Sequence, residues 1–257
     1  LESKYMPLPI GDAGEGLQNS RRADHVPESV FDRRMQRLRE MNDAFRDRHN
    51  TKEVRAYADM YEQALALMDS QDLDAFDISK EPQSIRDAYG EDPFGNGCLL
   101  ARRLIEHDVR FVEIVKDGWD THSDNFDRMG EQCPPVDRGL SALLADLDAR
   151  GLLEDTLVVL STEFGRTPRI DTQRVGRDHY PKAFTCLLAG GGIQGGIKYG
   201  KTDSEGHDVI EDLVTVEDFN ATIAYALGLP TDYEMYSPSG RPFRVAHKGI
   251  PEKRMFA

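Results

Sequence analysis

Cysteine is scarce in this chain. It occurs three times in 257 residues, as Cys98, Cys133 and Cys186, far apart and without a Cys-x-x-Cys pair. A thiolate zinc site and a disulfide framework both need closely spaced or paired cysteines, so the sequence argues against both. A single disulfide is still compatible with it, and the redox compartment is left open.

Basic charge is also in short supply. The chain has 32 lysines and arginines against 46 aspartates and glutamates, which gives a formal net charge of −14. A protein that binds nucleic acid needs a surplus of basic residues to neutralise phosphates. We therefore expect no nucleic-acid partner.

Long apolar runs and targeting signals are absent as well. No run approaches the roughly 20 residues that a membrane-spanning helix needs, so we expect no membrane span. The chain opens with Leu1-Glu2-Ser3, without a methionine or a signal peptide. We expect from this opening that the sequence begins in the middle of a longer polypeptide.

The composition that is present is ordinary for a globular protein, with 39% hydrophobic and 30% charged residues. Residues 1–27 are rich in proline, glycine and charge and predict an irregular arm. From Pro27 to about Ser70, apolar residues recur at helical spacing around a break at His49-Asn50. We interpret residues 1–90 as an extended arm followed by a helical hairpin that forms a cap or lid.

Residues 91–257 have the pattern of an α/β core, in which helical and strand-like segments alternate. Thr215-Val-Glu-Asp218 fits a capping box and begins the last predicted helix, which ends near Gly228. The other expected segments are a short helix over 75–89, helices at 98–107 and 136–149, and strands at 110–115, 157–160 and 184–189.

Acidic and imidazole side chains lie at the ends of these strands. Asp120 and His122 follow the first strand, Glu163 follows the second, and Asp178 and His179 precede the third. Carboxylate oxygens and imidazole nitrogens together suit zinc, manganese, iron and similar divalent ions. The alternative is structural: the aspartates cap turns, the histidines are satisfied loop residues, and Glu163 pairs with a nearby arginine.

Arg166 is the nearest arginine to Glu163 and has two interpretations. Its guanidinium can bind an anionic substrate group through two parallel hydrogen bonds, or it can form a salt bridge with one of the many carboxylates. Ser161 and Thr162 also lie at this strand end, where hydroxyl groups more often cap the backbone than act as nucleophiles.

A P-loop pattern, G-x-x-x-x-G-K-T, occurs from Gly195 to Thr202. A P-loop needs a helix that starts at its Lys-Thr pair, so that the helix N-terminus faces the phosphates. Here an acidic, turn-forming segment follows Thr202. We expect a turn or a β-hairpin at this position, and a P-loop NTPase is the last of the three functions considered.

Several motifs together resemble the DUF1501 family over almost the whole chain. That family is placed with the alkaline phosphatase/sulfatase superfamily. The motifs are Gly118-Trp-Asp-Thr-His122, Ser123-Asp-Asn-Phe126, Glu163-Phe-Gly-Arg-Thr-Pro168, Gly176-Arg-Asp-His-Tyr-Pro181, Leu188-Ala-Gly-Gly-Gly192 and Gly240-Arg-Pro-Phe243.

The resemblance implies a doubly wound, largely parallel α/β sheet, flanked by helices, with a two-metal site at its C-terminal edge. Asp120, His122 and His179 resemble the ligands of one metal. Glu163 resembles the carboxylate of the second metal, where Phe164 stands in place of the usual histidine. We include Asp178 among the candidate ligands and expect zinc, manganese or calcium.

The resemblance also implies a longer N-terminal portion, with an export signal, a further metal-binding aspartate and the nucleophile. From it we expect an exported, metal-dependent hydrolase of small anionic phosphate or sulfate esters, or the C-terminal part of one, with Arg166 and Glu163 as catalytic residues. The alternative is an exported binding or scaffold protein that keeps the fold without catalysis. The sequence does not indicate the oligomeric state.

Overall fold

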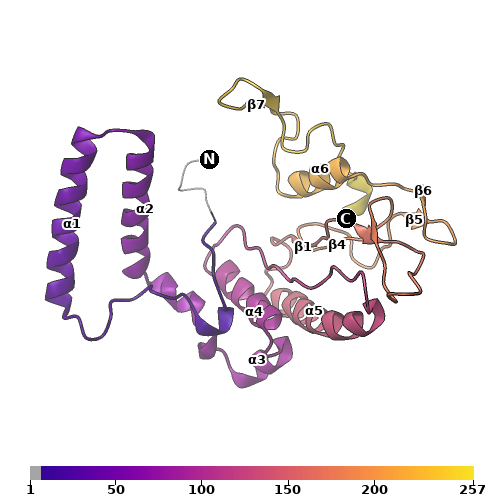
Figure 1. Cartoon of the computed structure of the whole chain (residues 1–257), viewed down its shortest axis with the longest axis horizontal. Helices are drawn as coiled ribbons and strands as arrows, with labels where there is room; N and C mark the ends of the chain where they lie inside the picture. Colours follow the sequence, from indigo (N-terminus) through magenta and orange to yellow (C-terminus); the bar gives the residue numbers. More distant parts are fainter. Residues whose placement is uncertain (1–6) are drawn as a thin grey trace. The chain divides into compact units, whose positions relative to one another are not determined.

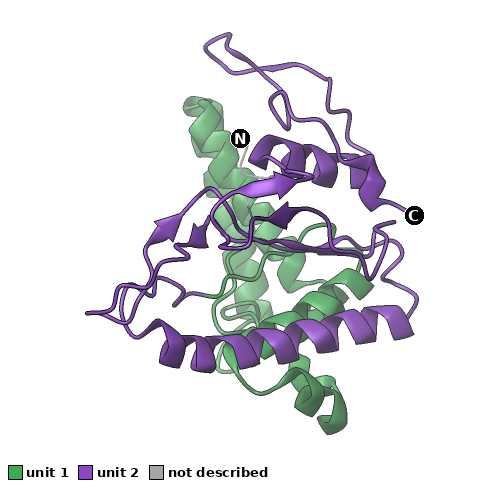
Figure 2. Ribbon diagram, turned by 90° about the vertical axis from the view of Figure 1, so that its right-hand side faces the viewer, with its two compact units in different colours: residues 1–116 green, residues 117–257 purple. Residues whose placement is uncertain are grey.

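The computed structural model describes residues 7–257 and has a mixed α/β architecture (Figure 1). The chain divides into two compact units, Leu1–Lys116 and Asp117–Ala257 (Figure 2). The helix α4 (Pro93–Glu106) therefore lies in the first unit, whereas the sequence-based boundary at residue 90 places it with the α/β core. Of the predicted arm, residues 1–6 lie outside the described residues, and the rest is irregular apart from the short 3₁₀ helix η2 (Ala13–Glu15).

The predicted hairpin is confirmed as two antiparallel helices, α1 (Glu28–Arg48) and α2 (Lys52–Met68), which lie side by side (Figure 1). The side chain of Thr51 caps α2 by accepting a hydrogen bond from the amide of Val54. Apolar residues at alternating spacings of four and three face the seam of such a helix pair. The half-buried residues with this spacing are Phe31, Met35 and Leu38 in α1 and Val54, Ala58, Tyr61, Leu65 and Met68 in α2.

The core of the first unit forms around α4. Between α2 and α4 lie η3 (Gln71–Phe76), η4 (Ile78–Lys80) and α3 (Gln83–Tyr89), so the helix predicted over 75–89 is broken into shorter pieces. Asp92 caps α4 by accepting hydrogen bonds from two backbone amides of its first turn. The buried apolar side chains are Leu73, Ala75, Phe76, Ile78, Tyr89, Cys98, Leu99, Leu100, Ala101 and Leu104.

A charged group is buried in this core. The side chain of Arg102 is only 1% exposed and lies 2.7 Å from a carboxylate oxygen of Glu81, which also pairs with Arg103. Burial opposes ionisation of Glu81, but its hydrogen bonds to the two arginines outweigh that effect and lower the pKa of the carboxyl. The ionised carboxylate is therefore the form that the folded unit favours.

We expect Glu81→Ala to destabilise the first unit by about 3–5 kcal/mol, because it leaves the buried Arg102 guanidinium without this partner. Denaturant unfolding followed by circular dichroism measures the effect. Glu62→Ala, which removes the exposed partner of Arg39, is the control and should cost at most about 1 kcal/mol. Because the pKa of Glu81 is lowered in the folded state, its contribution is present above the ordinary pKa and is lost as the pH falls below it. Equal losses in the two variants would contradict the assignment.

The second unit contains short strands that pair only in twos. The strands β1 (Val158–Leu160) and β4 (Leu187–Ala189) are antiparallel, as are β2 (Gly165–Arg166) and β3 (His179–Tyr180). The other pairs are β5 (Lys201–Thr202) with β6 (Val209–Glu211), and β7 (Met235–Tyr236) with β8 (Pro242–Phe243). Residues 201–202 form part of a hairpin and begin no helix, which agrees with the turn or β-hairpin expected at the P-loop pattern.

The predicted doubly wound parallel sheet is not present within residues 7–257. A parallel neighbour needs a crossover that returns the chain to the same edge, but β4 comes back beside β1 in the opposite direction. The expected strand over 110–115 is not formed: these residues have no regular secondary structure and pair with no strand in the described part of the chain. β1 is also less buried than its apolar sequence suggests, because its residues are half-buried or exposed.

The long helix α5 (Asn125–Ala149) starts earlier than predicted and contains Pro134 and Pro135, which we expected to precede it. A proline removes one helical hydrogen bond to the carbonyl four residues before it. Gly130 and Glu131, whose carbonyls lose those bonds, are exposed, so water can hydrate them. The helix packs into the second unit through its C-terminal half, where Leu143 and Leu147 are buried.

The last helix, α6 (Val216–Ala226), is confirmed with its capping box. The hydroxyl of Thr215 accepts a bond from the amide of Asp218, whose carboxylate accepts one from the amide of Thr215. Within residues 7–257 no helix is both long and apolar enough to cross a membrane.

Candidate metal centre

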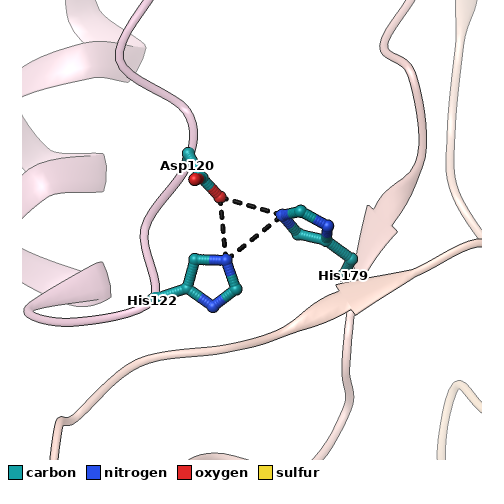
Figure 3. Close-up of side chains that lie close together, drawn as sticks. All are labelled: Asp120, His122 and His179. Carbon is teal, nitrogen blue, oxygen red and sulfur yellow. Dashed lines mark hydrogen bonds and ion pairs between the residues drawn. The ribbon is translucent and has the colours of Figure 1, made fainter.

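Three side chains of the second unit converge on one point (Figure 3). The Oδ1 atom of Asp120 lies 3.0 Å from Nε2 of His122 and 2.9 Å from Nε2 of His179. The two Nε2 atoms are 3.2 Å apart. One oxygen and two nitrogens that can bind a metal therefore form a nearly equilateral triangle.

The size of this triangle fits a divalent cation. Zinc binds imidazole nitrogen and carboxylate oxygen at about 2.0–2.2 Å, which places neighbouring ligand atoms about 2.8–3.6 Å apart at octahedral to tetrahedral angles. The observed separations of 2.9–3.2 Å fall within that range. Among the described residues, these three side chains form the group whose ligand atoms lie close enough together to hold one metal ion.

Main-chain hydrogen bonds bring two distant segments of the chain together at the site. The amides of Asp124 and Asn125 donate to the carbonyls of Arg174 and Val175, and the amide of Arg177 donates to the carbonyl of Thr121. These bonds join residues 121–125 to residues 174–177. His122 lies within the first segment, and His179 lies two residues beyond the end of the second.

Gly176 makes this approach sterically feasible. A Cβ atom at this position would lie 1.9 Å from the carbonyl oxygen of His122 and 2.2 Å from its carbonyl carbon. Both neighbours are backbone atoms, so they cannot move aside as a flexible side chain can. The absence of a side chain at residue 176 is therefore a condition for the geometry of the site.

The β2–β3 pair positions His179. Its register places His179 opposite Arg166, so both side chains belong to one small antiparallel ladder. The ring of Phe164, just before β2, packs against the His179 ring with 4.3 Å between centroids. Phe164, which stands where the family pattern has a histidine, therefore makes a packing contact with a candidate ligand.

Arg166 holds the carboxylate of the triangle. Its Nη2 atom donates to Oδ1 of Asp120 and to the carbonyl of Trp119, both at 2.8 Å, and its Nη1 donates to the carbonyl of Arg177 at 3.1 Å. Hydrogen bonds from His179 and then from Arg166 lower the pKa of Asp120 to about 2. The carboxylate is thus ionised and ready to bind a cation at any ordinary pH.

Asp178 contacts His122 from outside the triangle. Its Oδ1 atom is 2.8 Å from Nδ1 of His122, the ring nitrogen that does not face the other two ligand atoms. The hydrogen bond to His122 lowers the pKa of Asp178, with a further contribution from the charge of Arg174. The structure therefore places this predicted ligand against a ligand histidine and outside the converging group.

Glu163 is the other predicted residue that lies outside the group. It is exposed, one residue before Phe164, and contributes no atom to the triangle. Sequence reasoning also missed Thr167, which bonds to both main-chain groups of Asp178. The sequence signal for Gly176 was its position at the start of the Gly-Arg-Asp-His motif.

The profile described as "Protein of unknown function (DUF1501)" matches residues 1–254. The chain belongs to the DUF1501 family. No curated protein and no solved structure matches the chain significantly. The DUF1501 resemblance drawn from the motifs is thus confirmed, and the motifs that suggested it supply Asp120, His122 and His179.

We expect Gly176→Ala to destabilise the second unit by about 1–3 kcal/mol, because the added methyl group overpacks against the backbone of His122. The same change should abolish metal binding, since it separates His122 from His179. Thermal unfolding and zinc titration calorimetry measure the two effects. Gly130→Ala is the control: a Cβ there meets nothing within 4 Å, and alanine favours the helix. Zinc binding by the Gly176 variant at wild-type affinity would contradict the steric argument.

Proposed function

We propose that this DUF1501 protein binds a divalent metal ion through Asp120, His122 and His179 and uses it to hydrolyse a small anionic ester. The observation that supports this most directly is the convergence of one carboxylate oxygen and two imidazole nitrogens within 3.2 Å of one another. Two histidines and one carboxylate are a ligand set that recurs at catalytic metal sites.

The ligand chemistry narrows the expected metals. Calcium prefers six to eight oxygen ligands, whereas this group offers two nitrogens and one oxygen. Zinc and manganese accept imidazole together with carboxylate. Of the three metals expected from the sequence, we therefore favour zinc or manganese.

The exposure of the ligands favours a catalytic over a structural metal. The side chains of Asp120, His122 and His179 are 70%, 37% and 47% exposed, so a ligand from solution can reach them. Structural zinc sites are closed by four protein ligands, but catalytic sites keep three and leave a position open. When bound, such an ion polarises the ester and stabilises the charge that develops as it is cleaved.

Three guanidinium groups lie next to the candidate metal group. Arg166 contacts Asp120, Arg174 contacts Asp178, and the Arg177 guanidinium is held by the carbonyls of Thr167 and Pro168. Asp120, Asp171 and Asp178 offset their charge, so attraction of a phosphate or sulfate group would depend on the bound divalent ion. Arg166 also orients Asp120, which is the role its hydrogen bonds support best.

The alkaline phosphatase/sulfatase-like assignment belongs to this proposal, because it rests on motif resemblance. It includes a second metal at Glu163, Arg166 and Glu163 as catalytic residues, and export from the cytoplasm. Glu163 lies next to Phe164, which packs on His179, so it is close along the chain to a candidate ligand.

A second candidate is an exported metal-binding protein without catalysis. The hydrogen bonds of Arg166 favour it. Three protein acceptors engage the guanidinium and leave fewer of its N–H groups for a substrate. Metal uptake is common to both candidates, and turnover of an ester distinguishes them.

We expect wild-type protein to bind zinc or manganese and His179→Ala to lose that ion, because two ligands alone hold it weakly. Elemental analysis after gel filtration measures uptake, and chromogenic phosphate and sulfate esters measure turnover. His25→Ala, at an exposed position of the first unit, is the matched control and should bind as the wild type does. Unchanged metal content in the His179 variant would refute the ligand assignment, and uptake without turnover would favour the second candidate.

We expect Glu163→Gln to lower the metal stoichiometry from two ions to one if Glu163 binds the second metal of the proposed site. Glutamine keeps the shape of the side chain and removes the charge. Calorimetric titration with zinc counts the ions. An identical stoichiometry in wild type and variant would remove Glu163 from the ligand set and leave Asp120, His122 and His179 unaffected.

A further inference from the structure

We propose that Asp178 is a positioning residue that fixes the ring of His122 for metal binding, an inference that rests on the proposed metal site. Its Oδ1 atom is 2.8 Å from Nδ1 of His122. Figure 3 shows that this nitrogen faces away from Asp120 and His179, while Nε2 faces them. The carboxylate and the metal group therefore contact opposite sides of one imidazole ring.

The contact with Asp178 determines which nitrogen of the His122 ring carries the proton. A neutral imidazole has one N–H donor and one lone pair, on different nitrogens. When Nδ1–H donates to Asp178, the lone pair is left on Nε2, which is the atom 3.0 Å from Asp120 and 3.2 Å from His179. Asp178 thus selects the tautomer and the ring orientation that a metal requires.

Asp178 is itself held firmly enough to act in this way. Its amide donates to the hydroxyl of Thr167 at 3.1 Å, and its carbonyl accepts from the amide of Thr167 at 2.9 Å. Arg174 lies 3.4 Å from the same Oδ1 atom and pairs with Asp171 at 2.7 Å. Backbone and side chain are both anchored, so the carboxylate can define the orientation of a partner.

His179 is oriented by a different means. Its ring packs against Phe164, and among the residues described here no side chain is bonded to its Nδ1 atom. Asp178 should therefore affect His122 and leave the tautomer of His179 unchanged. This asymmetry separates a positioning role from a general effect of negative charge near the site.

Zinc titration combined with histidine ¹⁵N NMR tests the proposal on the full chain. The variants are Asp178→Ala, which removes the acceptor, and Asp178→Asn, which keeps an acceptor oxygen and removes the charge. Asp208→Asn is the control, because it removes one exposed carboxylate from the same unit. Circular dichroism establishes that each variant is folded, and the asparagine variant retains the test if the alanine variant does not fold.

We expect Asp178→Ala to bind zinc about 10–100-fold more weakly and to lose the protected Nδ1–H signal of His122. Asp178→Asn should keep that signal and bind with intermediate affinity, and Asp208→Asn should match the wild type. Wild-type affinity and spectrum in Asp178→Ala would overturn the proposal. Loss of a bound ion without any change at His122 would also overturn it, because Asp178 would then be a ligand. A wild-type protein that takes up no zinc would instead overturn the proposed function itself.

Discussion

The close contact between residues 121–125 and 174–177 is the constraint on which the candidate metal centre depends. About 50 residues separate the two segments along the chain, so bringing them together carries a loop-closure cost that grows with the logarithm of their separation. Three main-chain hydrogen bonds offset that cost. Gly176 has no side chain and so allows the two segments to come close enough to form them. Without this contact His122 would meet neither His179 nor Asp178, and the ligand atoms would not converge.

The charged and polar groups around this contact are connected to one another, which accounts for how exposed side chains keep a defined arrangement. Asp171, Arg174, Asp178 and His122 follow one another as successive contacts, and Asp120 and Arg166 continue the series. An isolated exposed ion pair contributes about 0–1 kcal/mol. A connected series restricts each side chain from two sides, so the network orients the ligands even where each of its pairs is weak.

The sequence predicted the helices better than the sheet, for physical reasons. Apolar spacing identified α1 and α2, and Thr215 with Asp218 identified the start of α6, because helical bonds and caps are local. Strand pairing is non-local, and the apolar run of β1 does not reveal that β4 returns antiparallel to it. At the site, Asp120 and His122 are two residues apart and reach the same point. Asp178 and His179 are adjacent, and neighbours in an extended chain point to opposite sides. This alternation explains why His179 joins the triangle and Asp178 contacts His122 from outside it. The identity of the two residues alone does not predict which of them does so.

Function has to be argued here from the site, because a family of unknown function and two-stranded sheets specify no chemistry. Asp120 is the centre of the site. Its Oδ1 atom lies within 3.0 Å of Arg166, His122 and His179, and the two imidazole nitrogens lie 3.2 Å from each other. The three atoms can therefore direct lone pairs at one point, which is the arrangement that a divalent cation requires of its ligands. Imidazole nitrogens bind a metal only when they are unprotonated, so a cation at this point would compete with protons for the same atoms. Such competition is a general property of ligand sets made of two imidazoles and a carboxylate.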